Sequence, residues 1–340
     1  MARIFIITLV TLSVLLAGSV AIKYFKKERK ITTTVQKEPI PIQLDEQITV
    51  VQEVTPPLPP PPSQPKPAAT PRVEPAAAVP ITAEGLPSKN RMDELFKAGS
   101  LFPLVQTVTY KSKVAWLKGR PAWISDYASH YKTSRHFIAR SLHGKGNYYK
   151  EEIANGNKFT VLNPDRDIEF HLLVDLSRAR LWLYAYDRGA HKRYLLKDYA
   201  VGLGRPDTLK SSGLTTPRGK YLLGNRIVAY KPGMMGVHNG KKTEMIRVFG
   251  TRWIPFEKEI ANTSAPAKGF GIHGAPWVDD GTSGKLKEDA SSIGCYASDG
   301  CVRLAADDME EIYAIIVTRP AYIDLVNRYE EAKLLGEEAP

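Results

Sequence analysis

A proline-rich segment near the N-terminus limits what this chain can fold into. Eleven of the 25 residues from Pro56 to Pro80 are proline, and four of them are consecutive at positions 59–62. Proline has no backbone N–H and a fixed φ, so such a segment forms no packed core and favours extended polyproline II. At about 3.1 Å per residue it reaches roughly 75 Å. We interpret residues 31–90 as a linker between an anchor and a working domain; a ligand segment for an SH3 or WW domain is the alternative.

An apolar run precedes this linker. Residues 4–22 contain no charged side chain, and at ~1.5 Å per residue they span about 28 Å, close to the thickness of a membrane's hydrocarbon core. We predict that residues 1–30 are a signal-anchor or a cleaved signal peptide. The protein would then lie at the periplasmic face of the inner membrane, or in the periplasm. Five basic residues follow the run and favour the opposite orientation by the positive-inside rule. We prefer export because of the chemistry described below.

The chain carries a formal net charge of +11, which favours anionic partners such as a membrane surface or an acidic wall polymer. No nucleic-acid-binding pattern accompanies the charge, so we expect no nucleic-acid partner. Cys295 and Cys301 are the only cysteines, too few for a disulfide framework. A zinc site made of these two cysteines and His273 would lack a fourth ligand, and the spacing of the cysteines does not suit such a site. We therefore expect neither a metal nor a cofactor.

Globular sequence begins near residue 91. In residues 91–165 we predict helices at 124–131 and 136–142 and a strand at 158–162, which together indicate a small α+β domain. From residue 168 the pattern changes to strands separated by turns, at residues 170–174, 180–184, 194–201 and 219–228. This predicts a mostly β domain over residues 168–327.

One late helix is predicted in the β domain, at residues 307–317. Asp307 and Glu310 have the spacing of a capping box, and Met309, Ile312 and Ile316 supply an apolar face. A last strand follows at residues 321–325, and residues 328–340 form a charged tail that we expect to be an exposed helix.

Two glycine-containing segments carry the residue types of cysteine catalysis. His273 lies between glycines in residues 269–277 (GFGIHGAPW), and Cys301 follows Gly300 in residues 298–304 (SDGCVRL). A cysteine needs a base or a positive neighbour to react at neutral pH, and a glycine before it leaves room for an acyl group. We predict Cys301 as nucleophile and His273 as base. Arg303 can bind a carboxylate through two parallel hydrogen bonds.

These segments resemble the L,D-transpeptidase (YkuD) family, whose signature is a His-Gly element followed by Ser-x-Gly-Cys-(Ile/Val)-Arg. Further matching stretches occur in the family's order across residues 168–326: 174–183 for the opening strands, 200–204 (AVGLG), 216–221 (TPRGKY), 249–254 (FGTRWI) and 292–294 (SIG).

The resemblance implies a mixed β-sandwich and a reaction on peptidoglycan stem peptides. Cys301 would attack the carbonyl of the third residue and expel the terminal D-Ala. The acyl group would then pass to the amine of another stem, giving a cross-link, or to water, as in an L,D-carboxypeptidase. The Gly274 carbonyl would orient His273, and the Gly300 and Cys301 amides would form an oxyanion hole. The expected substrate contacts are Arg303, Ser298, Asp299, Trp253 and Arg252.

Three features depart from the family pattern. Asp299 stands where a histidine is common, which leaves His273 as the only base and could raise its pKa. The 28 residues from His273 to Cys301 include an extra loop at 279–290, which is a lid, a partner contact or a loop without a role. Cys295 is either a filler side chain or the partner of Cys301 in a reversible disulfide. A chain that has lost catalysis and only binds peptidoglycan is the other alternative; an active Cys301 should have a low pKa and be alkylated rapidly.

Residues 121–124, 127–134 and 156–161 resemble a LysM module, a small βααβ unit that binds glycan strands of N-acetylglucosamine. The alternative for residues 91–165 is a helical domain that braces the catalytic one. His130, His136 and His143 lie six and seven residues apart; we interpret them as surface or glycan-contact side chains in preference to metal ligands.

Overall fold

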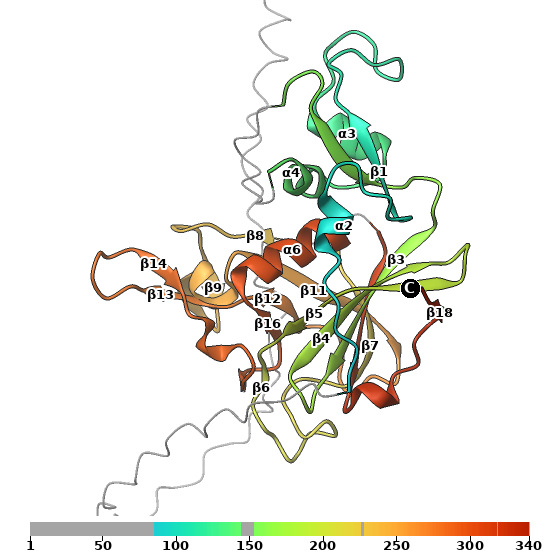
Figure 1. The fold of residues 1–340 in the computed structure, drawn as a ribbon. Coiled ribbons are helices and arrows are strands. Elements are labelled where there is room, and N and C mark those ends of the chain that lie inside the picture. The colour runs from blue at the N-terminus through green and yellow to red at the C-terminus, as the bar shows by residue number, and fades with distance from the viewer. Residues whose placement is uncertain (1–84, 144–152, 226–227, 318, 340) are drawn as a thin grey trace, which may run out of the picture. The chain divides into compact units, whose positions relative to one another are not determined.

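The computed structural model describes residues 85–143, 153–225, 228–317 and 319–339 (Figure 1). The predicted signal segment and almost all of the proline-rich linker lie outside the described residues. Within the described ranges, no helix is long and apolar enough to cross a membrane.

The region before the β domain contains a unit with the order strand, helix, helix, strand. Its elements are β1 (Val105–Thr109), α3 (Ile124–His130), α4 (Arg135–His143) and β2 (Lys158–Leu162), and β1 pairs antiparallel with β2 from Val105–Leu162 to Thr109–Lys158. Both predicted helices and the predicted strand are confirmed; β1 and a short preceding helix, α2 (Met92–Phe96), were not predicted. Tyr127, Ile138 and Phe159 are at the centre of this unit's own core. We call the unit the upstream module.

A single large sheet dominates the rest of the chain. Its strand order is β16-β12-β11-β7-β17-β3-β4-β5-β18, with β8 (Val228–Ala229) pairing with β11. The β12–β16, β17–β3 and β18–β5 pairs are parallel, and the other pairs are antiparallel. The mostly β fold with mixed strand directions is confirmed. The strands are β3 (Ile168–Asp175), β4 (Arg180–Asp187), β5 (Lys192–Ala200), β7 (Gly219–Leu223), β11 (Arg252–Ala261), β12 (Gly271–Gly274), β16 (Val302–Leu304), β17 (Ala321–Val326) and β18 (Glu337–Glu338).

Short elements surround the end of the sheet that is formed by β12 and the edge strand β16. Two of them, β6 and β15, pair in parallel, and two pairs form antiparallel hairpins, β9 with β10 and β13 with β14. Figure 1 shows β13 and β14 beside β9, to one side of the sheet. Their bounds are β6 (Leu203–Gly204), β9 (Met235–His238), β10 (Lys241–Glu244), α5 (Ile246–Phe249), β13 (Trp277–Asp279), β14 (Leu286–Glu288), the 3-10 turn η1 (Ala290–Ser292) and β15 (Tyr296–Ser298).

Helix α6 (Ala306–Ile316) confirms the predicted late helix, with Met309, Ile312 and Ile316 buried. The predicted capping box is wrong, because the helix begins one residue earlier and its N-cap, Ala305, makes no side-chain cap. The first amide, of Ala306, instead donates to Glu288 Oε1 at 2.6 Å. Glu288, in the extra segment at residues 279–290, therefore caps the helix that follows β16.

The upstream module and the β domain share a core. Leu95, Phe137 and Leu162 belong to the same buried cluster as Leu196 and Ile312. Ser134 Oγ donates to the Ala314 carbonyl at 2.9 Å, and Arg140 pairs with Glu311 at 3.4 Å. The module is thus packed against α6.

The tail is not the exposed helix that its charge suggested. It forms a 3-10 turn, η2 (Tyr329–Glu331), and then β18, and Ala339 is buried. The physical reason is an apolar sheet face formed by Leu173, Trp182 and Tyr184, which Tyr329, Ala332 and Leu334 cover.

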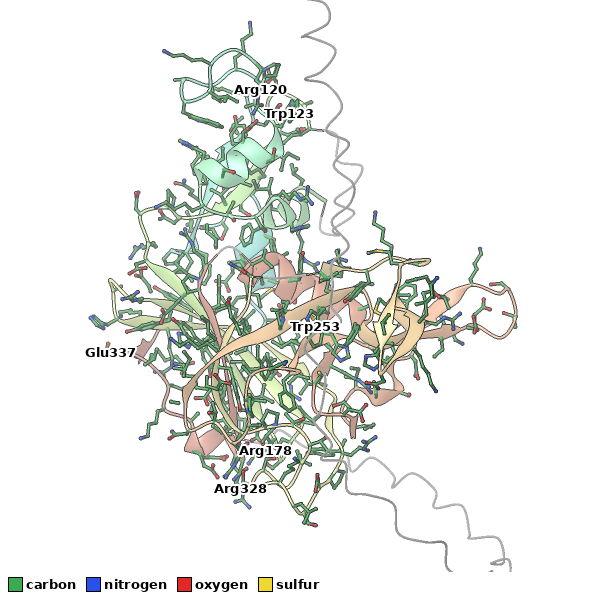
Figure 2. All side chains as sticks on the ribbon, turned by 180° about the vertical axis from the view of Figure 1, so that it is seen from behind. Arg120, Trp123, Arg178, Trp253, Arg328 and Glu337 are labelled. Atoms are coloured by element: carbon green, nitrogen blue, oxygen red, sulfur yellow. The ribbon has the colours of Figure 1, made fainter. Side chains whose placement is uncertain are left out.

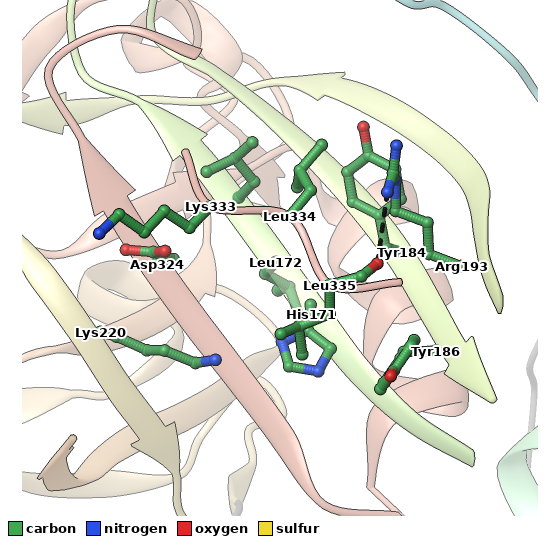
Figure 3. A pocket seen from close by; sticks show the side chains of 11 residues that line it. His171, Leu172, Tyr184, Tyr186, Arg193, Lys220, Asp324, Lys333, Leu334 and Leu335 are labelled. Carbon is green, nitrogen blue, oxygen red and sulfur yellow. Dashed lines mark hydrogen bonds between the residues drawn. The ribbon is translucent and has the colours of Figure 1, made fainter. Parts of the chain in front are cut away.

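A hollow lies between this tail and the sheet (Figure 3). None of the predicted site residues lines it, so it is separate from the predicted catalytic centre. Its lining comes from β3, β4, β5, β7, β17 and residues 333–335, and includes His171, Tyr186, Lys220, Asp324 and Leu335.

Candidate active site

The predicted base lies on β12, and the predicted nucleophile directly precedes β16, the parallel neighbour of β12. In the β12–β16 pair, Ile272 is opposite Val302 and His273 is opposite Arg303. Cys301 directly precedes β16 and is two residues before Arg303. Because side chains alternate along an extended chain, Cys301, Arg303 and His273 point to the same side of the sheet. The structure therefore brings the three residues with predicted chemistry together.

His273 is buried, with 3% of its surface exposed. Its Nδ1 lies 2.8 Å from the Gly274 carbonyl oxygen. A carbonyl only accepts, so Nδ1 carries the proton and Nε2 keeps a lone pair for base catalysis. The rings of Phe249 and Trp253 lie 5.3 and 5.8 Å from the imidazole.

This burial lowers the pKa of His273 to about 4, and the positive charge of Arg303 acts in the same direction. The expectation that Asp299 would raise this pKa is wrong. The Asp299 side chain is 73% exposed and forms an ion pair with Arg205 at 2.7 Å, and its charge does not contribute to the pKa of His273. His273 is therefore neutral at physiological pH.

Cys301 is partly buried. Its Sγ lies 3.9 Å from the Gly269 carbonyl oxygen. Burial raises the pKa of Cys301 to about 11, although Arg303 and a backbone hydrogen bond at Gly271 oppose the shift. The expectation of a low thiol pKa is wrong for this resting state, because desolvation outweighs the nearby positive charge. The pair rests as a neutral thiol and a neutral imidazole.

Ser298 stabilises the loop of residues 298–301, which we call the nucleophile loop, through its side chain. It is buried, its Oγ donates to the Cys301 carbonyl at 2.8 Å, and it accepts from the Gly300 amide at 3.1 Å. The Gly300 amide is therefore occupied and does not point into an oxyanion hole, contrary to expectation. For the Cys301 amide, the described part of the chain offers no hydrogen-bond acceptor. Ser298 supports the loop instead of facing a substrate.

Gly300 is required by its backbone and by its neighbours. Its φ is +130°, and an added Cβ would lie 2.6 Å from the Phe270 ring and 2.9 Å from the Thr215 carbonyl oxygen. No L side chain fits there without moving the loop.

Arg303 is half-buried, and its Nε is enclosed without a hydrogen-bond acceptor. Within the described ranges, no acidic side chain forms an ion pair with it. Burial lowers the pKa of its guanidinium, yet a guanidinium stays charged. A half-buried guanidinium that forms no ion pair with a carboxylate of the described residues is suited to binding a substrate carboxylate beside the thiol.

Trp253 and Arg252, two further predicted substrate contacts, lie on opposite sides of β11. Trp253, labelled in Figure 2, is the register partner of His273, and the two rings are 5.8 Å apart. Arg252 points to the other side of β11, is 5% exposed, and pairs with Glu310 at 2.8 Å. Because adjacent residues of a strand face opposite ways, Arg252 belongs to the packing against α6 and does not reach the site.

The extra segment at residues 279–290 is a β-hairpin for the most part, not a plain loop. Arg247 links it to the neighbouring hairpin, with Nη2 2.8 Å from Asp279 and Nε 2.8 Å from Glu244. Trp277 and Leu286 of this hairpin pack in one small apolar cluster with Phe249 and Trp253, which lie next to His273. His238 of the neighbouring hairpin lies 5.4 Å from the Phe249 ring. The segment is therefore tied into the surroundings of the base.

Sequence reasoning missed two residues of this site, Phe249 and Arg205. Both lie in or directly after stretches quoted for the family resemblance, but nothing in the sequence showed that Phe249 covers the imidazole or that Arg205 meets Asp299. Both cysteines are free thiols, and the Cys295 carbonyl accepts from the Leu203 amide at 2.9 Å. The Cys295–Cys301 disulfide stays a prediction.

One protein family and several solved structures are similar to parts of this chain. Residues 169–323 match the family model of YkuD, the L,D-transpeptidase catalytic domain. Two similar solved structures are Bd1075 of Bdellovibrio bacteriovorus, at 16% identity and a TM-score of 0.30 over 47% of this chain and 48% of that one, and the helical cell shape determining protein Pgp2 from Campylobacter jejuni, at 17% and 0.31 over 50% and 51%. The chain thus spans about half the length of either structure. No curated protein matches the sequence. Residues 169–323 are therefore a YkuD-family L,D-transpeptidase catalytic domain.

Proposed function

We propose that this protein is an L,D-transpeptidase that cross-links peptidoglycan through an acyl-enzyme on Cys301. The observation that carries the proposal is the placement of Cys301 and His273 on one side of two paired strands within a YkuD domain. The substrate is a stem tetrapeptide, and no cofactor takes part.

The first half-reaction starts from the neutral pair. As the thiol attacks the carbonyl of the third stem residue, Nε2 of His273 takes its proton. The Cys301 amide donates to the developing oxyanion. His273 then returns the proton to the departing D-Ala nitrogen, and Arg303 holds a carboxylate of the donor stem.

The second half-reaction decides between two activities. Attack by the amine of another stem on the thioester gives a cross-link, whereas attack by water gives a tripeptide and makes the enzyme an L,D-carboxypeptidase. The enclosure of His273 by Phe249 and Trp253 supports the transpeptidase, because it limits the access of water to the base.

The upstream module supplies a glycan-binding surface in this proposal, as a LysM-like unit would. Trp123 is 62% exposed, and the Arg120 guanidinium lies 4.8 Å from its ring (Figure 2). Arg120 is held in turn by two bonds of 2.7 Å to Asp126. A flat, fixed and exposed aromatic ring suits stacking on a sugar. The protein would meet its substrate and glycan strands in the cell envelope, either at the periplasmic face of the inner membrane or in the periplasm. Its N-terminal segment would make the membrane contact.

The direct test is to incubate the full-length chain with a disaccharide-tetrapeptide and to analyse products by mass spectrometry. Cross-linked dimer lacking one D-Ala is the expected product, and Cys301→Ala should abolish it. Cys295→Ala is the matched control and should keep it. Tripeptide alone would mean a carboxypeptidase. If no product forms while the chain still binds glycan strands in a Trp123-dependent way, the protein is a peptidoglycan-binding protein without catalysis.

A further inference from the structure

The Arg205–Asp299 ion pair stands at the nucleophile loop and has no part in the mechanism above. Nη2 of Arg205 lies 2.7 Å from Oδ1 of Asp299, and the two side chains are 60% and 73% exposed. Asp299 is two residues before Cys301 in the chain. Ion pairs this exposed contribute little to stability, so packing gives no reason for the pair.

The backbone on both sides of the pair is fixed. The Arg205 amide donates to the Ser298 carbonyl at 2.9 Å, and the Arg205 carbonyl accepts from the Thr215 amide at 2.9 Å. Ser298 is itself held by Gly300 and Cys301. Two exposed charges of opposite sign are therefore presented by a rigid frame next to the thiol.

The charge of Asp299 reaches the reacting groups. It raises the pKa of the Cys301 thiol and also acts on the Arg303 guanidinium. Two charged side chains therefore act on Cys301: the half-buried Arg303 and the exposed Asp299, which is paired with Arg205.

We propose that Arg205 and Asp299 form the acceptor subsite and recognise an α-amino-acid centre that carries an ammonium group and a carboxylate together. The inference rests on the proposed transpeptidase function. The contact between the two side chains joins Nη2 of Arg205 to Oδ1 of Asp299. The remaining guanidinium N–H groups can donate to the acceptor's carboxylate, and Oδ2 of Asp299 can accept from its ammonium group. Acceptors with an isolated amine, such as a lysine side chain, satisfy only Asp299.

The transfer step balances with these groups. The bound ammonium first loses one proton to solvent, and its nitrogen attacks the thioester carbonyl. The C–N bond forms and the C–S bond breaks, and the second proton passes through His273 to the departing sulfur. The products are an amide and the neutral Cys301 thiol, with one proton released.

The test compares acceptor stems on the full-length chain with one saturating donor. The acceptors carry a diamino dicarboxylic acid with a free terminal carboxylate, the same residue with that carboxyl amidated, or lysine. For wild type, amidation should raise the acceptor KM about tenfold, the loss of one charged hydrogen-bonding partner. Arg205→Gln should raise the KM for the free acid by a similar factor and be insensitive to amidation, because both changes remove the same contact. Asp299→Asn should weaken all three acceptors.

Arg188→Gln is the matched control, because Arg188 and Asp167 form an ion pair at 3.7 Å with similar exposures of 59% and 65% outside the site. It should leave the acceptor KM unchanged. Additive effects of Arg205→Gln and amidation, or an unchanged KM in both variants while D-Ala is still released, would overturn the acceptor subsite and leave the transpeptidase intact. Absence of D-Ala release from wild type would instead remove the proposed function, and the subsite with it.

Discussion

His273 and Arg303 are register partners across the parallel strands β12 and β16. The base of the proposed reaction therefore lies beside a fixed positive charge. That charge lowers the pKa of His273 and so favours the neutral imidazole. It also opposes the increase in the pKa of Cys301 that burial causes. Both groups are therefore neutral at rest, and the positive charge of Arg303 can stabilise the anion that forms during attack.

The pH dependence of acylation follows from these shifts. The pKa of His273 is lowered to about 4 and that of Cys301 is raised to about 11. The competent state has a neutral imidazole and a neutral thiol, so kcat/KM for D-Ala release should rise through about pH 4 and then stay level over the neutral range. A profile of initial rates from pH 3 to 10 checks this; a steady increase between pH 7 and 9 would contradict it, since it would report a thiol that must ionise in free solution before it reacts.

Thiol alkylation offers an independent check on the resting state. A pKa of about 11 is two units above the ordinary value of 9.0, so the thiolate fraction at neutral pH is lower by roughly a hundredfold. In a Cys295→Ala chain, Cys301 should react with iodoacetamide correspondingly more slowly than a small free thiol at pH 7. A rate equal to or above that of the small thiol would show a stabilised thiolate.

Substitution at Gly300 should disrupt the nucleophile loop. Gly300→Ala places a Cβ 2.6 Å from the Phe270 ring in a backbone conformation with φ of +130°. We expect a loss of about 1–3 kcal/mol of unfolding free energy from this strain and a strong decrease in D-Ala release. Gly281→Ala is the control, because Gly281 also has a positive φ but no neighbour within 4 Å. Equal activity of the two variants would argue against a rigid loop.

The cap on α6 should have a measurable weight. Glu288→Ala removes the acceptor for the Ala306 amide and should lower the free energy of unfolding by about 1 kcal/mol, as the loss of a helix cap does. Thermal or urea unfolding measures the change. Glu257→Ala, at an exposed strand position, serves as comparison. If Glu288→Ala matched it, the 279–290 hairpin would have no part in holding the helix.

Local patterns predict this structure where the relevant contacts are near in sequence. The strands around Leu172 and Leu183, the helix with Met309 and Ile312, and the glycine-flanked His273 follow from short-range alternation and turn chemistry. Predictions were wrong or absent where contacts between segments far apart in the sequence determine the position of a residue. Arg252 lies away from the site because Glu310, 58 residues later, draws it to α6, and the tail is ordered by an apolar sheet face formed more than a hundred residues earlier. The low pKa of His273 likewise depends on Phe249 and Trp253, which the sequence alone does not bring to it.

Formation of the acyl-enzyme on Cys301 can be observed within a single turnover. The full-length chain is mixed with a stem tetrapeptide, quenched in acid within the first turnover, and mapped by peptide mass spectrometry. We expect a tripeptidyl mass on the peptide containing Cys301, with one D-Ala released per adduct and far slower formation in His273→Ala. An adduct on Cys295, or D-Ala release without any adduct on Cys301, would contradict it.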